Sequence, residues 1–431
     1  MKKSQTEIAH FIANSFNIDY VFKTVGGTKV DDIYIYRDGV YRKGGRDLIR
    51  SECEKVLGSF SKTQLVNEVV NKIVRMTLIG RDELGCDDVN LVCVENGVLD
   101  LKTGKLGPHN SKYGFTSRIP VKFLKSAKCP KIHKFVEEVL YDENDIEGMQ
   151  EWLGVLLFRE YIGKKAAIFL GGTDTGKTTM LNLIEKFIGR ENISGVSLQR
   201  LAGDKFAAAD FYKKHVNICD ELSERDVDDI DTFKMVTGKS QINGEYKFGD
   251  SFKFINFAKL MFATNKSPNV KVNAEDEAYY NRWLIWRFDN VFDKKDKKTN
   301  PNMVKDMTSD KEMSGLLNWA LEGLGRFMKK GYFTNDKDTL TTKLILQRDS
   351  NPMAAFVQDS LKQDEAGWLS KQELYDAFVK YCKLNNLPIC TMDKFGKTIR
   401  MYCSYMENGR KQLINGWRNV KLKSGAVIFG I

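Results

Sequence analysis

Alternation of apolar and polar residues predicts strands and helices in the first part of the chain. Residues 31–43, DDIYIYRDGVYRK, alternate around Asp38-Gly39, a pair typical of a tight hairpin turn. Helical spacing of apolar residues follows through about residue 79. Residues 89–106 alternate again, with turn residues at Asn96-Gly97 and Thr103-Gly104. The pattern predicts an N-terminal region of mixed α and β structure, delimited as residues 1–128, serving as a collar for assembly or as a partner-binding module.

The middle of the chain alternates between helical and strand-like segments. From Pro130 to Phe158 the apolar spacing is helical, and the apolar run KAAIFL at 165–170 predicts a buried strand. A helix is expected from Lys177. Further segments are predicted as strands at 214–222 and 258–265, a hairpin at 242–257 and a helix at 313–331. Strands that alternate with helices indicate an α/β core, delimited as residues 129–335.

The C-terminal part has a different order of elements. A loose stretch at 332–352 is interpreted as a linker. Ser370 and Glu373 form a capping box before a helix with one apolar face, and MDKFGKTIRMYC predicts a second, short helix. RKQLINGWRNVKLK predicts a basic hairpin with Asn415-Gly416 as its turn. Two helices and a basic hairpin are in the order of a winged-helix domain, assigned to residues 353–431.

Composition and charge narrow the class of protein. The 431 residues contain no apolar run near the roughly 20 residues that a membrane helix needs, and the N-terminus has no apolar segment typical of a signal peptide, so a cytoplasmic location without a membrane is expected. The net charge is +10, and residues 391–424 hold eight basic side chains against two acidic ones. That local excess favours contact with a polyanion over a merely solvated charged face.

One glycine-rich loop matches a phosphate-binding motif. FLGGTDTGKTTM, residues 169–180, satisfies G-x-x-x-x-G-K-[ST] and stands between a predicted strand and a predicted helix, as that motif requires. The expected ligands are ATP and Mg²⁺, with Lys177 on the phosphates and the Thr178 hydroxyl on the metal. The predicted nucleotide-binding residues are Gly171, Gly172, Thr173, Asp174, Thr175, Gly176, Lys177, Thr178 and Thr179. A second Gly-Lys-Ser, at 238–240, lacks both the first glycine and a preceding strand and is rejected.

Polar residues at the ends of later strands complete a hydrolytic site. Asp220 and Glu221 follow the strand-like residues Val216, Ile218 and Cys219, so that Asp220 is expected to hold the metal through water, and Glu221 to polarise the attacking water. Asn265 ends another strand and is expected to orient that water; the alternative is a turn asparagine before Pro268. Arg282 is the candidate arginine finger that reaches a neighbouring subunit's nucleotide, with Arg287 as its competitor.

Two basic segments are candidates for contact with DNA. The hairpin INGEYKFGDSFKFINF places Lys247 and Phe248 at or near its tip, where a cation and an aromatic ring suit a loop that tracks a single strand; the alternative is an ordinary surface hairpin. In the C-terminal segment, the candidate DNA-binding residues are Lys394, Lys397, Arg400, Arg410 and Lys411.

The order of these motifs resembles that of superfamily 3 helicases, the compact ring motors of small viruses and mobile elements. The chain looks most like the helicase part of the phage and plasmid primase-helicase family, related to the poxvirus primase-helicase. Stretches typical of that family are VENGVLDLKTGKLGPH (94–109), CPKIHKFVEEVL (129–140), FKMVTG (233–238) and SKQELYDAFVKYCKLNN (370–386). The chain departs from the family at Lys239-Ser240, where members often read Gly-Asp, and at Asn281-Arg282, where many carry two arginines.

The resemblance implies a P-loop AAA+-like ATPase core and a homo-hexamer or similar ring that moves 3′→5′ on single-stranded or forked DNA. Relatives commonly carry a primase or polymerase domain before the helicase, so a separate primase is expected here. Lys177, Thr178, Asp220, Glu221, Asn265 and Arg282 then have the roles given above, and Lys247 matches the hairpin lysine that contacts DNA. The favoured function is an ATP-dependent DNA helicase in the replication of a phage, plasmid or other mobile element. The alternative is a replication initiator or loader that binds DNA and uses ATP as a switch.

Overall fold

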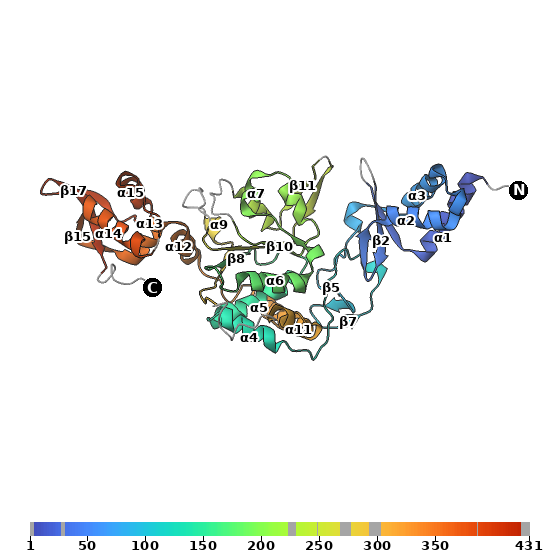
Figure 1. The fold of residues 1–431 in the computed structure, drawn as a ribbon, viewed down its shortest axis with the longest axis horizontal. Helices are drawn as coiled ribbons and strands as arrows, with labels where there is room; N and C mark the ends of the chain where they lie inside the picture. Colours follow the sequence, from blue (N-terminus) through green and yellow to red (C-terminus); the bar gives the residue numbers. More distant parts are fainter. Residues whose placement is uncertain are drawn as a thin grey trace. The chain divides into compact units, whose positions relative to one another are not determined.

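The computed structural model describes residues 4–26, 31–222, 230–247, 249–267, 277–292, 303–385 and 387–423 (Figure 1). The chain divides into two compact units. The first contains Met1–Leu222, Ile230–Ala263 and Arg282–Asp336, and the second is built mainly from Thr264–Asn281 and Lys337–Ile431. Short 3₁₀ turns lie at Gly58–Phe60 (η1), Arg81–Glu83 (η2), Ser111–Tyr113 (η3), Arg190–Asn192 (η4), Ala207–Phe211 (η5) and Ile399–Met401 (η6).

At the N-terminus, three helices pack on a four-stranded sheet of order β3-β2-β1-β4. The helices are α1 (Gln5–Asp19), α2 (Gly45–Leu57) and α3 (Thr63–Thr77), and the strands are β1 (Phe22–Val25), β2 (Asp32–Arg37), β3 (Val40–Lys43) and β4 (Leu78–Ile79). The hairpin predicted at 31–43 is confirmed, because Asp38 and Gly39 both have positive φ, 49° and 87°, as a two-residue turn of this kind requires.

A small antiparallel sheet follows, formed by β5 (Leu91–Val94), β6 (Gly97–Asp100) and β7 (Leu106–Gly107). The strands predicted at 89–106 and the turn at Thr103-Gly104 are therefore confirmed. The turn predicted at Asn96-Gly97 lies one residue earlier, at Glu95-Asn96, because Gly97 pairs with Val94 inside the strands. The guanidinium of Arg159 donates hydrogen bonds to the carbonyl oxygens of Cys86, Asp88 and Leu91, which fixes the segment leading into this sheet.

The central sheet has the order β14-β8-β13-β10-β9. Its strands are β8 (Ala166–Leu170), β9 (Ile193–Ser194), β10 (Val216–Cys219), β13 (Lys259–Thr264) and β14 (Trp283–Arg287). The pairs β14–β8, β13–β10 and β10–β9 are parallel. Every residue of β8 and β13 is buried, as expected for strands covered on both faces. A mixed α/β fold with a parallel sheet is thus confirmed.

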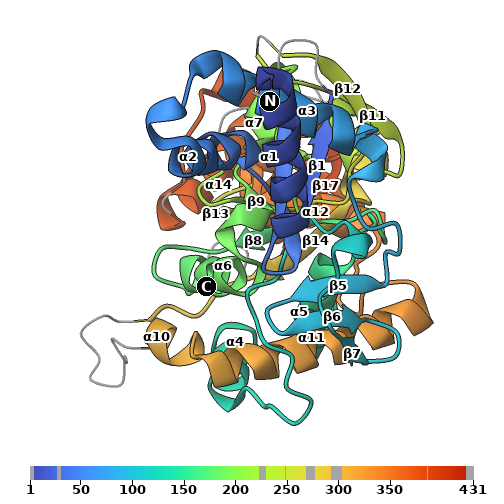
Figure 2. The same ribbon diagram turned by 90° about the vertical axis from the view of Figure 1, so that its right-hand side faces the viewer.

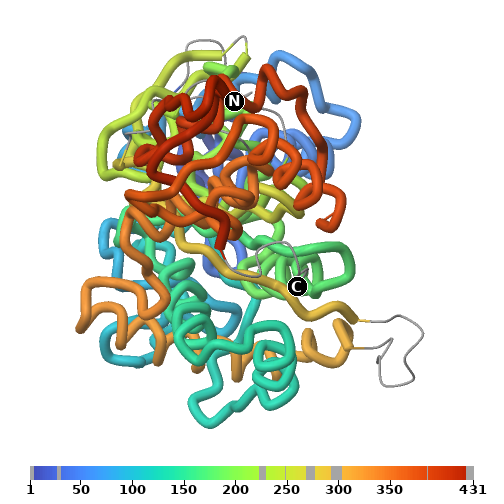
Figure 3. The backbone as a smooth tube through the Cα atoms, turned by 90° about the vertical axis from the view of Figure 1, so that its left-hand side faces the viewer, coloured from blue at the N-terminus to red at the C-terminus, as the bar shows by residue number. Residues whose placement is uncertain are grey.

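Four helices pack together against this sheet: α4 (Pro130–Val139), α5 (Glu143–Leu157), α6 (Lys177–Ile188) and α11 (Asp310–Lys330) (Figure 1). In Figure 3, α4 and α5 in teal run beside α11 in orange, although the two segments lie far apart in the sequence. Gly154 and Gly323 allow this packing, because a Cβ on Gly154 would collide with the carbonyl oxygen of Ala320, and one on Gly323 with that of Gln150. The short α10 (Met303–Met307) precedes α11.

Other elements of the first unit lie between the central strands in sequence. They are α7 (Leu198–Gly203), α8 (Asp231–Val236) and the antiparallel hairpin of β11 (Gln241–Glu245) and β12 (Ser251–Ile255), which Figure 2 shows in yellow-green. The hairpin predicted at 242–257 is confirmed. Gly238 follows a helix instead of a strand, in agreement with the rejection of that second Gly-Lys-Ser.

The second unit includes a three-stranded sheet of order β15-β17-β16. Its elements are α9 (Glu277–Tyr280), α12 (Thr339–Ser350), α13 (Pro352–Ser360), β15 (Leu361–Ser370), α14 (Lys371–Leu384), α15 (Met392–Thr398), β16 (Glu407–Lys411) and β17 (Ile414–Leu422). Phe356, Phe378, Phe395 and Trp417 are among the buried residues of its core. The capping box of Ser370 and Glu373 is confirmed.

Two predictions for this part of the chain are wrong. The stretch at 332–352, predicted to be loose, contains helix α12, whose first turn is capped by the Asp338 side chain, although the boundary between the two units does fall within it. The turn of the basic hairpin is not Asn415-Gly416, because these residues pair with Arg410 and Gly409 inside the strands. Gln412 and Leu413 make the turn instead, with φ of 47° and 65°. None of the described helices is long and apolar enough to cross a membrane.

Candidate nucleotide site and nucleic-acid surfaces

The glycine loop joins the carboxyl end of β8 to the first residue of α6. Asp174 and Gly176 have left-handed backbone, with φ of 58° and 92°. A Cβ on Gly176 would lie 2.7 Å from a methyl group of Val139, so glycine suits this position both by conformation and by space. The loop therefore turns tightly into the helix, whose first amide groups point toward it.

Lys177 is folded against the loop that precedes it. Its Nζ donates to the carbonyl oxygen of Gly171 at 2.7 Å and also to that of Gly172. The residue is only 8% exposed. Burial lowers the pKa of the amine, and the charge of Asp220 partly opposes that shift. A buried cation whose partners are uncharged carbonyl oxygens can bind an anion in place of those oxygens.

The strand β10 brings the acidic pair to the same edge of the sheet. Asp220 follows Cys219, the last residue of β10, and the hydroxyl of Thr178 donates to its Oδ2 at 3.2 Å. Glu221 is next, exposed and with φ of 64°, an uncommon conformation for a residue other than glycine. The amide of Leu222 donates to the carbonyl of Ala263 at 2.8 Å, which fixes the chain directly after the acidic pair. The structure thus brings together Lys177, Thr178 and Asp220.

Asn265 follows the carboxyl end of β13, the strand between β8 and β10 in the sheet order. It is exposed and belongs to the second unit. The preceding hydroxyl, of Thr264, donates to the carbonyl of Lys266 at 2.6 Å and closes a turn around Asn265. Both the predicted role and the turn alternative are compatible with this local geometry.

The two arginine candidates stand at opposite ends of β14. Arg287 is paired with Leu170, the last residue before the glycine loop. Arg282 precedes the strand, and its carbonyl accepts a hydrogen bond from the amide of Ala166 at the other end of β8. Its Nε donates to Thr237 Oγ1 at 2.9 Å. The sequence did not suggest Thr237 as a partner of Arg282. Thr237 directly follows α8, and no pattern of apolar and polar residues marks it as a functional residue.

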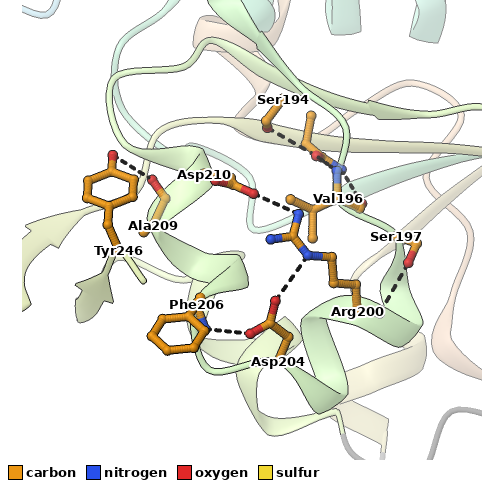
Figure 4. Close-up of polar contacts among 10 residues, drawn as sticks. Ser194, Val196, Ser197, Arg200, Asp204, Phe206, Ala209, Asp210 and Tyr246 are labelled. Atoms are coloured by element: carbon orange, nitrogen blue, oxygen red, sulfur yellow. Dashed lines mark hydrogen bonds and ion pairs between the residues drawn. The ribbon is translucent and has the colours of Figure 1, made fainter. Parts of the chain in front are cut away.

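Two contacts beside its turn fix the β11–β12 hairpin to the segment around η5. Tyr246 OH donates to the carbonyl of Ala209 at 3.3 Å, and Lys205 forms an ion pair with Glu245 at 3.1 Å. Figure 4 shows Tyr246 beside η5 and Arg200 between two carboxylates, those of Asp204 and Asp210, at 3.1 and 2.8 Å. Lys247 is exposed in the turn of this hairpin, and Phe248 lies outside the described residues.

The predicted basic residues of the second unit are all exposed. Lys394 and Lys397 are on α15, and Lys397 pairs with Asp393 at 2.7 Å. Arg400 follows in η6, and Arg410 and Lys411 are on β16. The core of this unit includes Phe395 of α15, Ile399 of η6 and Trp417 of β17, the strand that pairs with β16. These cations are therefore displayed to solvent by the short helix and the hairpin.

Three family models match separate parts of the chain. "D5 N terminal like" matches residues 6–141, "Family of unknown function (DUF5906)" matches residues 169–287, and "Poxvirus D5 protein-like" matches residues 348–427. The two D5 matches support a relationship with the D5-like primase-helicase family, as the motifs predicted. Assignment to superfamily 3 stays a prediction. No curated protein matches the chain.

Solved structures of the NrS-1 C-terminal region are similar to this chain. An A form apo structure of that region matches over 97% of this chain and 100% of the other, with 13% sequence identity and a TM-score of 0.50. An A form apo structure of NrS-1 residues 305–718 covers 95% of this chain and 99% of the other, with 14% identity and a TM-score of 0.49. The similarity to the first of these two structures is a similarity of fold.

Proposed function

We propose that the chain is an ATP-driven DNA helicase that acts in the replication of a phage, plasmid or other mobile element. The observation that carries this proposal is the meeting of the Thr178 hydroxyl and the Asp220 carboxylate, 3.2 Å apart, at the end of the glycine loop that also holds the buried Lys177. A loop of this kind followed by a helix is suited to a nucleoside triphosphate. The D5 matches support a setting in viral or phage replication.

The residues of the loop fit Mg²⁺ and ATP. Thr178 and Asp220 would hold the metal, and the amide groups of the loop and Lys177 would hold the phosphates. When bound, the metal neutralises charge that builds up on the phosphate oxygens. Lys177 is expected to release the carbonyl oxygens of Gly171 and Gly172 and to bind phosphate oxygens instead, which raises its pKa again.

Glu221 is the proposed group that accepts a proton from the attacking water. It directly follows the metal-site acid, and its left-handed backbone, with φ of 64°, aims its side chain differently from a continued strand. Uncommon backbone conformations of this kind gather at functional sites, because surrounding packing must hold them. Asn265 is proposed to orient the same water from the end of the neighbouring strand.

Arg282 is proposed to act on the nucleotide of an adjacent subunit. Its place at the amino end of β14 is the edge opposite the glycine loop of its own chain, so a role in its own site is disfavoured. An arginine supplied in trans makes hydrolysis depend on assembly and accelerates it by roughly 10³ to 10⁵. A homo-hexamer or similar ring is the corresponding assembly.

DNA contact is assigned to two surfaces. Lys247 on the β11–β12 hairpin is proposed to follow the single strand as the ring moves. The arrangement of α14, α15 and the β16–β17 hairpin is in the order of a winged helix, and Lys394, Lys397, Arg400, Arg410 and Lys411 are its proposed phosphate contacts.

Unwinding of a forked duplex by the purified chain with ATP and Mg²⁺ tests the proposal. The unaltered protein is expected to separate the strands, Lys177→Ala to lose that activity, and Lys186→Ala, an exposed lysine at the far end of the same helix, to retain it. Retention of full unwinding by Lys177→Ala would contradict the proposed site.

The exposed cations of the second unit favour one other candidate, a DNA-binding initiator or loader with an ATP switch. That protein would bind a particular duplex sequence through residues 353–431. Its sequence-specific binding would persist in Lys247→Ala and disappear when residues 353–431 are removed, whereas the helicase is expected to lose DNA-dependent turnover in Lys247→Ala.

A further inference from the structure

A cleft of about 740 Å³ lies in the first unit between the N-terminal sheet and the segments around η5 and the β11–β12 hairpin. Its walls include residues of strands β2 and β3, residues 212–214, and Tyr246, Gly249, Asp250 and Phe252. Five cationic side chains line it against three carboxylates, Asp32, Glu191 and Asp250. The cations are Arg42, Lys43, Arg81, Lys213 and Lys214. This cleft is separate from the glycine loop and from Lys247.

Aromatic rings alternate with the cations in this cleft. The guanidinium of Arg81 lies 4.9 Å from the centre of the Phe252 ring, and Lys213 Nζ lies 5.1 Å from that of Tyr212. Tyr212 and Phe252 meet edge to face at 4.9 Å, and Tyr246 stacks on Phe252 at 5.5 Å. Cations beside flat rings are the combination that holds single-stranded nucleic acid, because the rings stack on bases and the cations bind phosphates.

Asp32 and Glu191 each pair with a cation of the cleft. Asp32 pairs with Lys43 at 2.7 Å, and Glu191 pairs with Arg42 at 3.2 Å. Lys213 donates to the backbone carbonyl of Leu84 at 2.7 Å, an uncharged partner. Burial and the nearby charges of Arg81 and Lys43 lower the pKa of Lys213 to about 8. Like charges are thus held together, and a bound anion would relieve their repulsion.

We propose that this cleft binds single-stranded DNA, with phosphates on Arg81 and Lys213 and bases against Tyr212 and Tyr246. The inference rests on the proposed function, in which a single strand is the track. Tyr246 directly precedes Lys247, so the cleft is continuous along the chain with the hairpin that is proposed to follow the strand. Tyr246 lines the cleft, and its hydroxyl donates to the carbonyl of Ala209, as Figure 4 shows.

The test is the affinity of the full chain for a short fluorescent oligothymidylate, measured by anisotropy over a range of salt concentrations. Arg81→Ala with Lys213→Ala is expected to weaken binding by roughly tenfold or more, and to reduce the slope of log affinity against log salt by about 1.4, the value for two phosphate contacts with a single strand. Lys186→Ala with Arg190→Ala removes the same charge from residues outside the cleft and is expected to change neither quantity appreciably. Arg81→Lys with Lys213→Arg is expected to restore most of the affinity.

Cross-linking of the unaltered protein provides a measurement that does not depend on the folding of variants. An oligonucleotide carrying 5-iododeoxyuridine is expected to give photoproducts on Tyr212 or Tyr246.

The proposal is overturned if the cross-links map only outside the cleft, or if the Arg81 and Lys213 double variant binds like its control. A double variant with altered oligomeric state but unchanged DNA affinity would make the cleft a subunit contact instead. If the unaltered chain binds no oligothymidylate at all, the helicase function fails together with the cleft; if it binds and the double variant does too, only the cleft proposal fails.

Discussion

Arg282 and Arg287 occupy opposite ends of the same strand, β14, with Arg287 beside the last residue before the glycine loop and Arg282 at the far edge of the sheet. Five residues of extended chain separate them by about 16 Å. Arg287 is therefore near the glycine loop of its own chain, whereas Arg282 is at the opposite edge, from which we propose that it serves another subunit.

Mixing of inactive variants distinguishes the two arginines. Arg282→Ala lacks the proposed finger but keeps an intact loop, and Lys177→Ala has the opposite defect, so a mixed ring contains some complete interfaces. The ATP hydrolysis rate of that mixture is expected to exceed the sum of the separate rates. The hydrolysis rate of a mixture of Arg287→Ala and Lys177→Ala is measured in the same way for comparison. If only the Arg287 mixture shows an excess, the finger is Arg287, and if neither does, the trans arrangement is wrong.

The pair of Thr178 and Asp220 predicts a selective defect in metal use. Asp220→Asn is expected to lower the hydrolysis rate, or to raise the Mg²⁺ concentration needed for hydrolysis, by roughly 10- to 100-fold. The reason is that the variant lacks the carboxylate proposed to help hold the metal. Thr178→Ser keeps the hydroxyl and is expected to stay active, while Thr178→Val is not. Asp47→Asn, at an exposed carboxylate on α2, is the control. An unchanged Mg²⁺ dependence in Asp220→Asn would remove Asp220 from the metal site.

The Lys213 amine predicts a pH dependence of DNA affinity. With a pKa of about 8 it is charged below that pH and neutral above it, so affinity for oligothymidylate is expected to fall severalfold from pH 7 to pH 9. The charged groups that act on Lys213 are Arg81, Lys43, Lys23 and Asp82. Tyr212 stays neutral, because burial raises its pKa to about 12.

Lys213→Arg keeps the charge at every pH used. That variant is expected to lose the pH dependence. A fall of equal size in Lys213→Arg would assign the titration to another group.

Gly416 predicts a loss of stability in the second unit. A Cβ there would lie 2.5 Å from the carbonyl oxygen of Leu369 and 2.6 Å from the Trp368 ring. Gly416→Ala is expected to reduce the free energy of unfolding of this unit by about 1–3 kcal/mol, measured by denaturant titration. Gly396→Ala, on α15 with no atom within 4 Å of its Cβ, is expected to be neutral or to stabilise by up to about 1 kcal/mol. Equal midpoints for the two variants would contradict the close packing.

The same glycine shows why one turn was predicted wrongly from the sequence. Asn415-Gly416 is the strongest local turn signal in its segment, yet Trp368 requires a residue without a side chain beside it, and Trp417 is buried in the register that results. Tertiary packing thus moved the turn to Gln412 and Leu413. Helix α12 was missed for a related reason, since only Thr342 and Leu346 of its residues are buried and the apolar pattern is weak.

Prediction was most successful where the signal is local. The loop from Gly171 to Thr178 is a contiguous motif, and Val216, Ile218 and Cys219 mark the strand ahead of Asp220, so the meeting of Thr178 and Asp220 was foreseeable. Contacts between distant segments carry no such signal. Arg282 with Thr237, and Arg81 with Phe252, join residues from separate elements, and only the folded chain brings them together.

The most direct test of the helicase assignment is the ATP hydrolysis rate of the purified chain, alone, with single-stranded DNA and with blunt duplex, using Glu221→Gln as the blank. The account predicts strong stimulation by the single strand and little by the duplex. A rate that responds to duplex and is indifferent to single strands would contradict it and favour the ATP-switched initiator.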